Sequence, residues 1–221
     1  MNRRLFHKLL LALASSVTFL GAAPALGADE APDALIKRLT QEALDIVKSD
    51  KAVQAGDVAR ITELIDEKVM PHLNFERMTR SAVGPQWRQA TPEQRKRLEA
   101  EFKTLLVRTY SGAMGQTNNL SFSVQPLRAA PADKEVIVRT LIKGRGDPIQ
   151  VDYRLEHTPG VGAGWKVFNL NVLGVWLVDT YRSQFAQELS AKGIDGLITT
   201  LTARNSANAA GSAKTAKPAK G

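Results

Sequence analysis

The side chains of this chain that could carry out acid–base chemistry are two carboxylates in a strongly alternating segment. Residues 148–157 alternate apolar and polar side chains, which is typical of an antiparallel strand with one buried face. Asp152 and Glu156 fall on the polar side of that strand and are surface charges if the polar side faces water. A carboxylate in an apolar pocket of a half-open sheet serves as the base in isomerase-like folds, which is the main enzymatic alternative.

Histidine, cysteine and glycine patterns do not indicate another catalytic or metal site. Beyond the N-terminal segment, His72 and His157 are far apart and do not have the spacing of metal ligands. The chain has no cysteine, which excludes disulfides, thiol catalysis and thiolate metal sites. It has no nucleophile elbow and no phosphate-binding loop, and residues 160–164 predict a hairpin loop because no helix follows their glycines. We therefore expect no metal and no cofactor, and the two carboxylates remain as the enzymatic alternative.

A run of large apolar side chains near the C-terminal helices is not explained by catalytic or metal-binding chemistry. Residues 172–178 (VLGVWLV) are apolar on nearly every side of a helix. A helix start of this kind must be buried all round or must border a cavity. Two interpretations stay open at this point, a well-packed core and an apolar ligand lodged between a helix and the sheet.

The periodicity of the apolar residues divides the chain into helices, then strands, then helices again. Thr91 and Gln94 form a capping box around Pro92, which predicts a helix start. After residue 116 the apolar period changes from about 3.6 to 2. This order predicts an α+β fold in which a curved, four-stranded antiparallel sheet packs with a helical subdomain. The expected helices are 30–48, 57–69, 92–114, 173–191 and 195–204, and the expected strands are 121–127, 135–143, 148–157 and 164–171.

The two ends of the chain carry most of its net positive charge. Residues 1–27 have a basic start, an apolar centre and small residues before Gly27, as in a signal peptide cleaved after Gly27, with Ala28 as the second choice and an uncleaved anchor as the alternative. Residues 205–221 are rich in alanine and lysine and predict a disordered tail. Of the net charge of +8, three charges lie in each end, which leaves about +2 for a folded domain of residues 28–204. So small a charge argues against a nucleic-acid partner.

Several segments together resemble one protein family. They are residues 65–73 (IDEKVMPHL), 90–95 (ATPEQR), 175–185 (VWLVDTYRSQF) and 192–198 (KGIDGLI). In this order they are similar to the MlaC family, also known as the toluene-tolerance Ttg2D family. The resemblance covers about residues 33–204 and leaves the tail outside.

The resemblance implies a periplasmic phospholipid carrier that is not an enzyme. Members of the family move phospholipids between the two membranes of Gram-negative bacteria and maintain the lipid asymmetry of the outer membrane. The implied fold has a sheet of the nuclear-transport-factor or cystatin kind (about 120–171), a helical part (about 30–116), C-terminal helices (about 173–204) and an apolar pocket between sheet and helices. The implied partners are an inner-membrane ABC transporter with an MCE-domain protein and an outer-membrane lipoprotein–porin complex. The alternatives are the isomerase-like enzyme and a periplasmic chaperone, and we expect a monomer with phospholipid as its cargo.

Alternation along the strands and the phase of the helices suggest which side chains line this pocket. Acyl chains make no hydrogen bonds, so aliphatic and aromatic groups are expected, with charge at the rim only. Tyr181, Arg182 and Gln184 are expected to organise the C-terminal helix. The predicted lipid-binding residues are Leu73, Phe75, Met78, Leu106, Tyr110, Val138, Val151, Tyr153, Val167, Val175 and Trp176.

Overall fold

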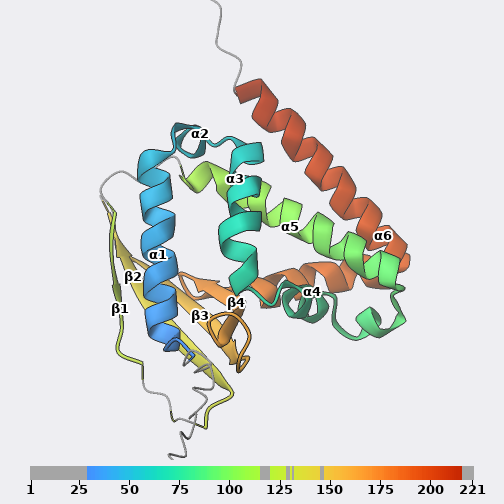
Figure 1. Ribbon diagram of the computed structural model, residues 1–221. Helices are drawn as coiled ribbons and strands as arrows, with labels where there is room; N and C mark the ends of the chain where they lie inside the picture. Colours follow the sequence, from blue (N-terminus) through green and yellow to red (C-terminus); the bar gives the residue numbers. More distant parts are fainter. Residues whose placement is uncertain (1–28, 115–119, 128–129, 131, 145–146, 216–221) are drawn as a thin grey trace, which may run out of the picture.

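The computed structural model describes residues 29–114, 120–127, 130, 132–144 and 147–215 (Figure 1). The predicted signal peptide, residues 1–27, lies outside them. The strands are β1 (Ser121–Val124), β2 (Glu135–Lys143), β3 (Ile149–His157), β4 (Trp165–Val172) and β5 (Val175–Trp176). The longer helices are α1 (Pro32–Ser49), α2 (Lys51–Gln54), α3 (Val58–Leu64), α4 (Phe75–Val83), α5 (Pro92–Met114) and α6 (Leu177–Thr215). Short helical turns η1 (Ile65–Val69), η2 (Met70–His72) and η3 (Gly84–Gln89) connect them.

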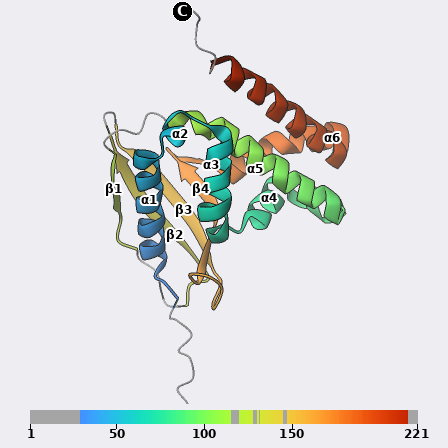
Figure 2. The ribbon, with the colours of Figure 1, turned by 45° about the horizontal axis from the view of Figure 1, so that its top comes forward.

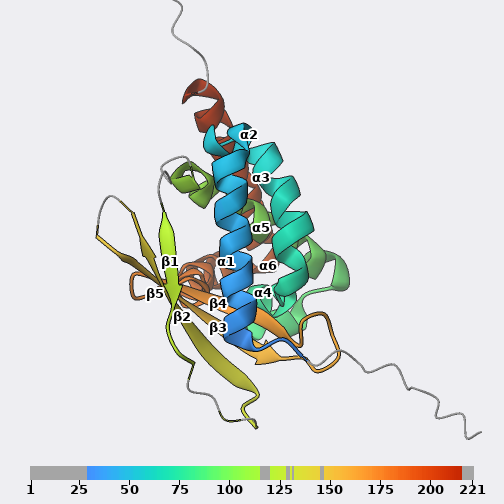
Figure 3. The same ribbon diagram turned by 60° about the vertical axis from the view of Figure 1, so that its left-hand side comes forward.

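The sheet is antiparallel and open, with its strands in chain order from β1 to β5. α1 packs against β1 and β2, whereas α4, α6 and the η2 turn pack against β4 (Figures 1 and 3). α3 packs on α5. On the face of β2 that packs against α1, Val136 and Val138 are buried and pair with Leu155 and Tyr153 of β3. The alternation in the sequence therefore predicted the strands correctly, and the α+β class is confirmed.

The sheet has a fifth strand that the sequence analysis did not predict. Residues 173–176 were expected to begin a helix, but Leu173 and Gly174 both have positive φ angles, 52° and 87°. They make a two-residue hairpin turn, after which Val175 and Trp176 pair with Val172 and Asn171. The predicted helix start at residue 173 was wrong, because an apolar run does not distinguish a hairpin from a helix.

The two predicted C-terminal helices are the two halves of α6, which bends at Gly193 (φ 66°). Val178, Tyr181, Phe185 and Leu189 of the first half pack in one buried cluster with α4 and α5, and Leu197, Ile198 and Leu201 of the second half belong to the same cluster. The end of the second half projects beyond the other helices (Figure 2). Asn205 is buried and donates to the side chain and the backbone carbonyl of Glu101, so α5 holds the helix beyond residue 204. α6 continues to Thr215 within the segment predicted as a disordered tail, as the high helix propensity of alanine allows.

Buried apolar side chains of the described residues form three clusters. The largest joins α4, α5, α6 and β4 and contains most of the aromatic rings. A second lies between α1 and the sheet, with Leu35 and Ile36 fully buried at its centre. The third, between α2, α3 and α5, is built around Val53, Ile61 and Val107. Within the ranges given above, no helix combines the length and apolar character that a membrane crossing requires.

Candidate functional site

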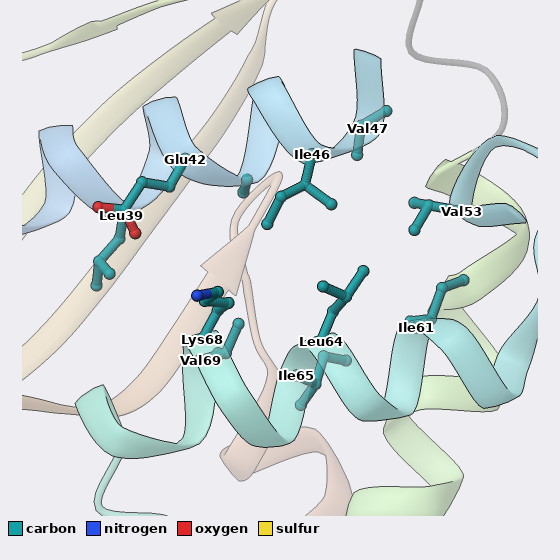
Figure 4. A pocket seen from close by; sticks show the side chains of 11 residues that line it. Leu39, Glu42, Ile46, Val47, Val53, Ile61, Leu64, Ile65, Lys68 and Val69 are labelled. Carbon is teal, nitrogen blue, oxygen red and sulfur yellow. The ribbon is translucent and has the colours of Figure 1, made fainter. Parts of the chain in front are cut away.

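An apolar pocket with a volume of about 120 Å³ lies between α1 and the helix formed by α3 and η1 (Figure 4). It lies between the second cluster, which packs on the sheet, and the third cluster, which packs between α2, α3 and α5. Two charged side chains, Glu42 and Lys68, occur in its lining, and the other lining residues are aliphatic. The lining consists of Leu39, Glu42, Ala43, Ile46, Val47, Val53, Ile61, Leu64, Ile65, Lys68 and Val69.

Helix α1 provides one wall because it has two apolar faces. Leu35 and Ile36 point to the sheet and are fully buried. Ala43, Ile46 and Val47 lie further along the helix and line the pocket, where Ile46 and Val47 stay half-buried (Figure 4). One helix thus packs on the sheet with one stripe and leaves its second stripe incompletely covered.

The opposite wall is positioned by helix caps. Asp50 caps α2 and accepts a hydrogen bond and an ion pair from Arg60 of α3 at 2.8 Å. Asp57 caps α3 through the backbone N–H groups of Ala59 and Arg60. Gly56, with φ 75°, makes the turn between the two helices. These contacts join the two walls of the pocket at its α2 end.

The wall continues through a π-helical turn rather than a regular helix. The sequence predicts one helix over residues 57–69, but the segment from Ile65 to Val69 is a π-helix and Pro71 lies in the following 3₁₀ turn. Extra turns of this kind are frequent at functional sites because they shift the faces of a helix. Here the turn lies in the wall that carries Lys68 and Val69, and the Val69 side chain is 39% exposed.

Charges surround the pocket at the α1–η1 side. Glu42 pairs with Arg38 at 3.2 Å, and Lys68 pairs with Glu67 at 2.8 Å. The hydrogen bond with Glu67 raises the pKa of Lys68, and the Glu42 charge acts in the same direction. Burial lowers the pKa of the nearby His72, and the positive charge of Arg38 lowers it further. The pocket is therefore apolar inside and has charged groups of both signs at its rim.

The predicted lipid-binding residues do not line this pocket in the structure. Four of them, Leu73, Phe75, Met78 and Leu106, belong to or pack on the cluster of α4, α5 and α6. Three others, which are Val138, Tyr153 and Val167, belong to or pack on the cluster between α1 and the sheet, and Leu73 contacts both clusters. Val151 is buried in β3 at 8% exposure.

Three more of the predicted residues lie at the molecular surface or close to it. Tyr110 is 39% exposed and Val175 is 52% exposed. Trp176 is half-buried beneath the guanidinium group of Arg154, which lies 4.0 Å from the centre of its ring. The role of all eleven residues in lipid binding stays a prediction.

The two carboxylates of the enzymatic alternative are held by polar partners outside the pocket. Asp152 is buried, accepts two hydrogen bonds from the amide of Gln150 at 3.0 and 3.1 Å, and lies 3.9 Å from Arg139. Glu156 accepts from Asn74 and Arg77, both at 2.5 Å. Neither is therefore a free surface charge, and neither lies in an apolar environment. In the part of the chain that is described, no three His, Asp or Glu side chains gather as a metal site would require.

Three comparisons with known proteins bear on this arrangement. A family model described as "MlaC protein" matches residues 37–203. The chain is similar to a phospholipid-binding protein from Ralstonia solanacearum solved in complex with a phospholipid, with a TM-score of 0.76 and 38% identity, covering 80% of this chain and 98% of that one. It is 26% identical to the toluene tolerance protein Ttg2D of Pseudomonas putida over 81% of this chain and 83% of the relative. It is 19% identical to the intermembrane phospholipid transport system binding protein MlaC of Haemophilus influenzae over 79% and 82% of the two chains.

Proposed function

Because the chain belongs to the MlaC family, we propose that it is a phospholipid carrier that moves lipid between the two membranes of a Gram-negative cell envelope. The observation that carries the proposal is the pocket between α1 and α3–η1, which is aliphatic inside and charged at its rim. Acyl chains need apolar walls without fixed hydrogen-bond donors. A phosphate and its head group need charged partners in contact with water. The likeness to a protein solved with phospholipid supports the same function.

The pocket must widen before it holds a lipid. Its volume of about 120 Å³ is well below the ~300–1,000 Å³ of typical ligand sites. α1 packs on the sheet, whereas α3 packs on α5, so the two walls belong to different layers. They are joined through α2 and its caps, and we propose that they separate when acyl chains enter.

A widened pocket extends towards residues predicted from the sequence. Leu39 both lines the pocket and packs on the cluster between α1 and the sheet. That cluster includes Val138 and Val167, with Tyr153 packed against it. We propose that acyl chains pass Leu39 and reach this face of the sheet. The head group then stays near Glu42 and Lys68 at the rim.

The free energy of lipid transfer suits a protein that releases its lipid rather than one that retains it. Each methylene group moved out of water contributes about 0.8 kcal/mol, so some thirty methylenes amount to roughly 25 kcal/mol. Lipid that leaves a membrane for this pocket exchanges one apolar environment for another. Only the difference between the two counts, and it can be small enough for release at the second membrane.

The cellular setting follows from the family and is part of the proposal. We propose that the protein works in the periplasm as a monomer and exchanges lipid with two membrane complexes. One is an inner-membrane ABC transporter with an MCE-domain protein, and the other is an outer-membrane lipoprotein–porin complex. Toluene tolerance in a relative then reflects an intact outer-membrane barrier and does not require a toluene site.

A lipid-transfer assay tests the proposed function. Donor vesicles with a fluorescent, self-quenched phospholipid are mixed with unlabelled acceptor vesicles and small amounts of the purified protein. We expect transfer to accelerate with the native protein and to fall to the background rate for Ile46→Arg, which places a charge in the pocket wall. Gln41→Arg, on the exposed face of α1, is the matched control and should transfer normally. Equal transfer by both variants, or none by the native protein, would contradict the proposal.

A further inference from the structure

A second hollow lies where α4, η3 and the first half of α6 meet. These elements lie on the other side of the molecule from β1 (Figures 1 and 3). Its volume is about 410 Å³. We call it the arginine groove, since three arginines line it around a short turn of the backbone. These residues are Arg80, Arg88 and Arg182, together with Gly84, Pro85 and Trp87.

The three guanidinium groups of the arginine groove have no carboxylate partner among the described residues. All three side chains are exposed, and no Asp or Glu lines the groove. Several arginines elsewhere in the fold are instead paired with carboxylates. Arg38 and Arg60 each bind two carboxylates. Three uncompensated like charges around one hollow create a local field that favours a negatively charged ligand.

The local structure fixes the backbone that carries these arginines. Gly84 has a φ of 75°, so the turn between α4 and η3 requires glycine and brings the end of α4 next to η3. A Cβ atom at Gly84 would lie 3.8 Å from Nε of Arg182, which shows how closely α6 approaches this turn. The indole of Trp87, only 4% exposed, fills the space beneath the groove. Arg95 donates to the carbonyl oxygens of Trp87 and Arg88 and so fastens η3 to α5.

The chemistry of the groove favours a protein segment over a membrane surface. Guanidinium groups bind carboxylates or phosphates through two parallel hydrogen bonds. A membrane-binding surface adds large apolar side chains that enter the lipid boundary. Among the described residues the exposed large apolar side chains lie elsewhere, at Val69, Tyr110, Ile149, Val161, Leu173 and Val175. The groove is also hollow, which suits an extended peptide better than a flat bilayer.

We propose that the arginine groove is a docking site for an acidic segment of a partner protein, whose carboxylates bind Arg80, Arg88 and Arg182. The groove is built from α4, η3 and α6, whereas the apolar pocket is built from α1, α2, α3 and η1. Docking and lipid binding therefore use separate residues. Loss of charge in the groove should leave the lipid content of the protein unchanged.

Fluorescence anisotropy with a fluorescein-labelled octaglutamate peptide tests this proposal. At low ionic strength we expect each of Arg80→Gln, Arg88→Gln and Arg182→Gln to weaken peptide binding about threefold to tenfold. The triple variant should bind at least roughly thirtyfold more weakly than the native protein. The control is a triple variant of equal charge, Lys37→Gln, Arg139→Gln and Arg204→Gln, which changes exposed residues outside the groove. It should stay within about threefold of the native protein.

Two results would overturn the proposal. One is equal peptide binding by the two triple variants, since the peptide would then respond only to net charge. The other comes from phosphatidylglycerol vesicles offered as an alternative probe. If the groove variant loses vesicle binding but keeps peptide binding, the groove meets a membrane and not an acidic segment. Far-ultraviolet circular dichroism and bound-lipid content confirm that each variant is folded, and the single variants give the answer if a triple variant is not.

Discussion

The cluster between α4, α5 and α6 and the layer between α1 and α3 bury apolar side chains in different ways. Phe102 lies with its ring centre 5.0 Å from Tyr181, 5.3 Å from Phe185 and 5.7 Å from Phe75, and it is 1% exposed. Between α1 and α3 the side chains are aliphatic, and Ile46 and Leu64 stay half-buried beside an open pocket. Aromatic rings in this protein therefore hold the helices together, whereas aliphatic side chains surround the pocket proposed to bind lipid.

Removing an aromatic ring should have the largest effect. Phe102→Ala deletes a fully buried ring that contacts three others, so the free energy of unfolding should fall by about 3–5 kcal/mol. Chemical denaturation followed by circular dichroism measures this change. Phe122→Ala, at a half-buried site in β1, should cost much less. Equal losses at the two sites would contradict the view that the aromatic cluster is the main structural core.

Substitutions that enlarge a side chain should affect the stability of the two regions differently. Ala82 is fully buried in the aromatic cluster, and Ala82→Phe should lower the free energy of unfolding by about 1–3 kcal/mol because no space is available. Ala43 faces the pocket, and Ala43→Phe should leave the stability of the lipid-free protein unchanged or raise it by roughly 0.5–1 kcal/mol. Denaturation of delipidated protein measures both. If both variants lost a similar amount of unfolding free energy, the pocket would have no room for a larger side chain.

His72, in the η2 turn that follows the pocket wall, should give a smaller effect that depends on pH. Burial, followed by the charge of Arg38, lowers the pKa of His72 below its ordinary value of 6.5. The folded state therefore favours the neutral imidazole. The contribution of neutral His72 to the free energy of unfolding is complete above pH 6.5, and it is lost as the pH falls through the lower pKa of the folded state. Urea unfolding at a series of pH values should show a steeper loss of stability on acidification for the native protein than for His72→Gln. Parallel curves would exclude a contribution from His72.

The sequence was informative about local structure. The capping box of Thr91 and Gln94 is present, with each residue bonded to the other. The alternation over residues 149–157 gave β3, because neighbouring residues of a strand point to opposite faces. The hairpin before α6 was missed because Leu173 adopts a positive φ angle that its type does not indicate. Such a turn depends on the pairing of β5 with β4, and the local sequence does not indicate this pairing.

The site was harder to predict than the fold for a physical reason. Leu39, Ala43, Ile46 and Val47 lie within the helix predicted over residues 30–48, but periodicity does not tell which neighbour each apolar position meets. The predicted lining favoured aromatic and strand residues such as Phe75, which the structure uses in its packed clusters. One signal pointed to the pocket. α1 has more apolar residues than one interface needs, as a helix between two layers requires.

Native mass spectrometry tests the central claim most directly, which is that phospholipid occupies the pocket between α1 and α3–η1. The protein is purified from the periplasm of a Gram-negative host without detergent, together with Ile46→Arg and Gln41→Arg. We predict about one phospholipid on each native chain and on each Gln41→Arg chain, and none on folded Ile46→Arg. A native protein that is well folded and free of lipid, or an Ile46→Arg variant that keeps its lipid, would contradict the account.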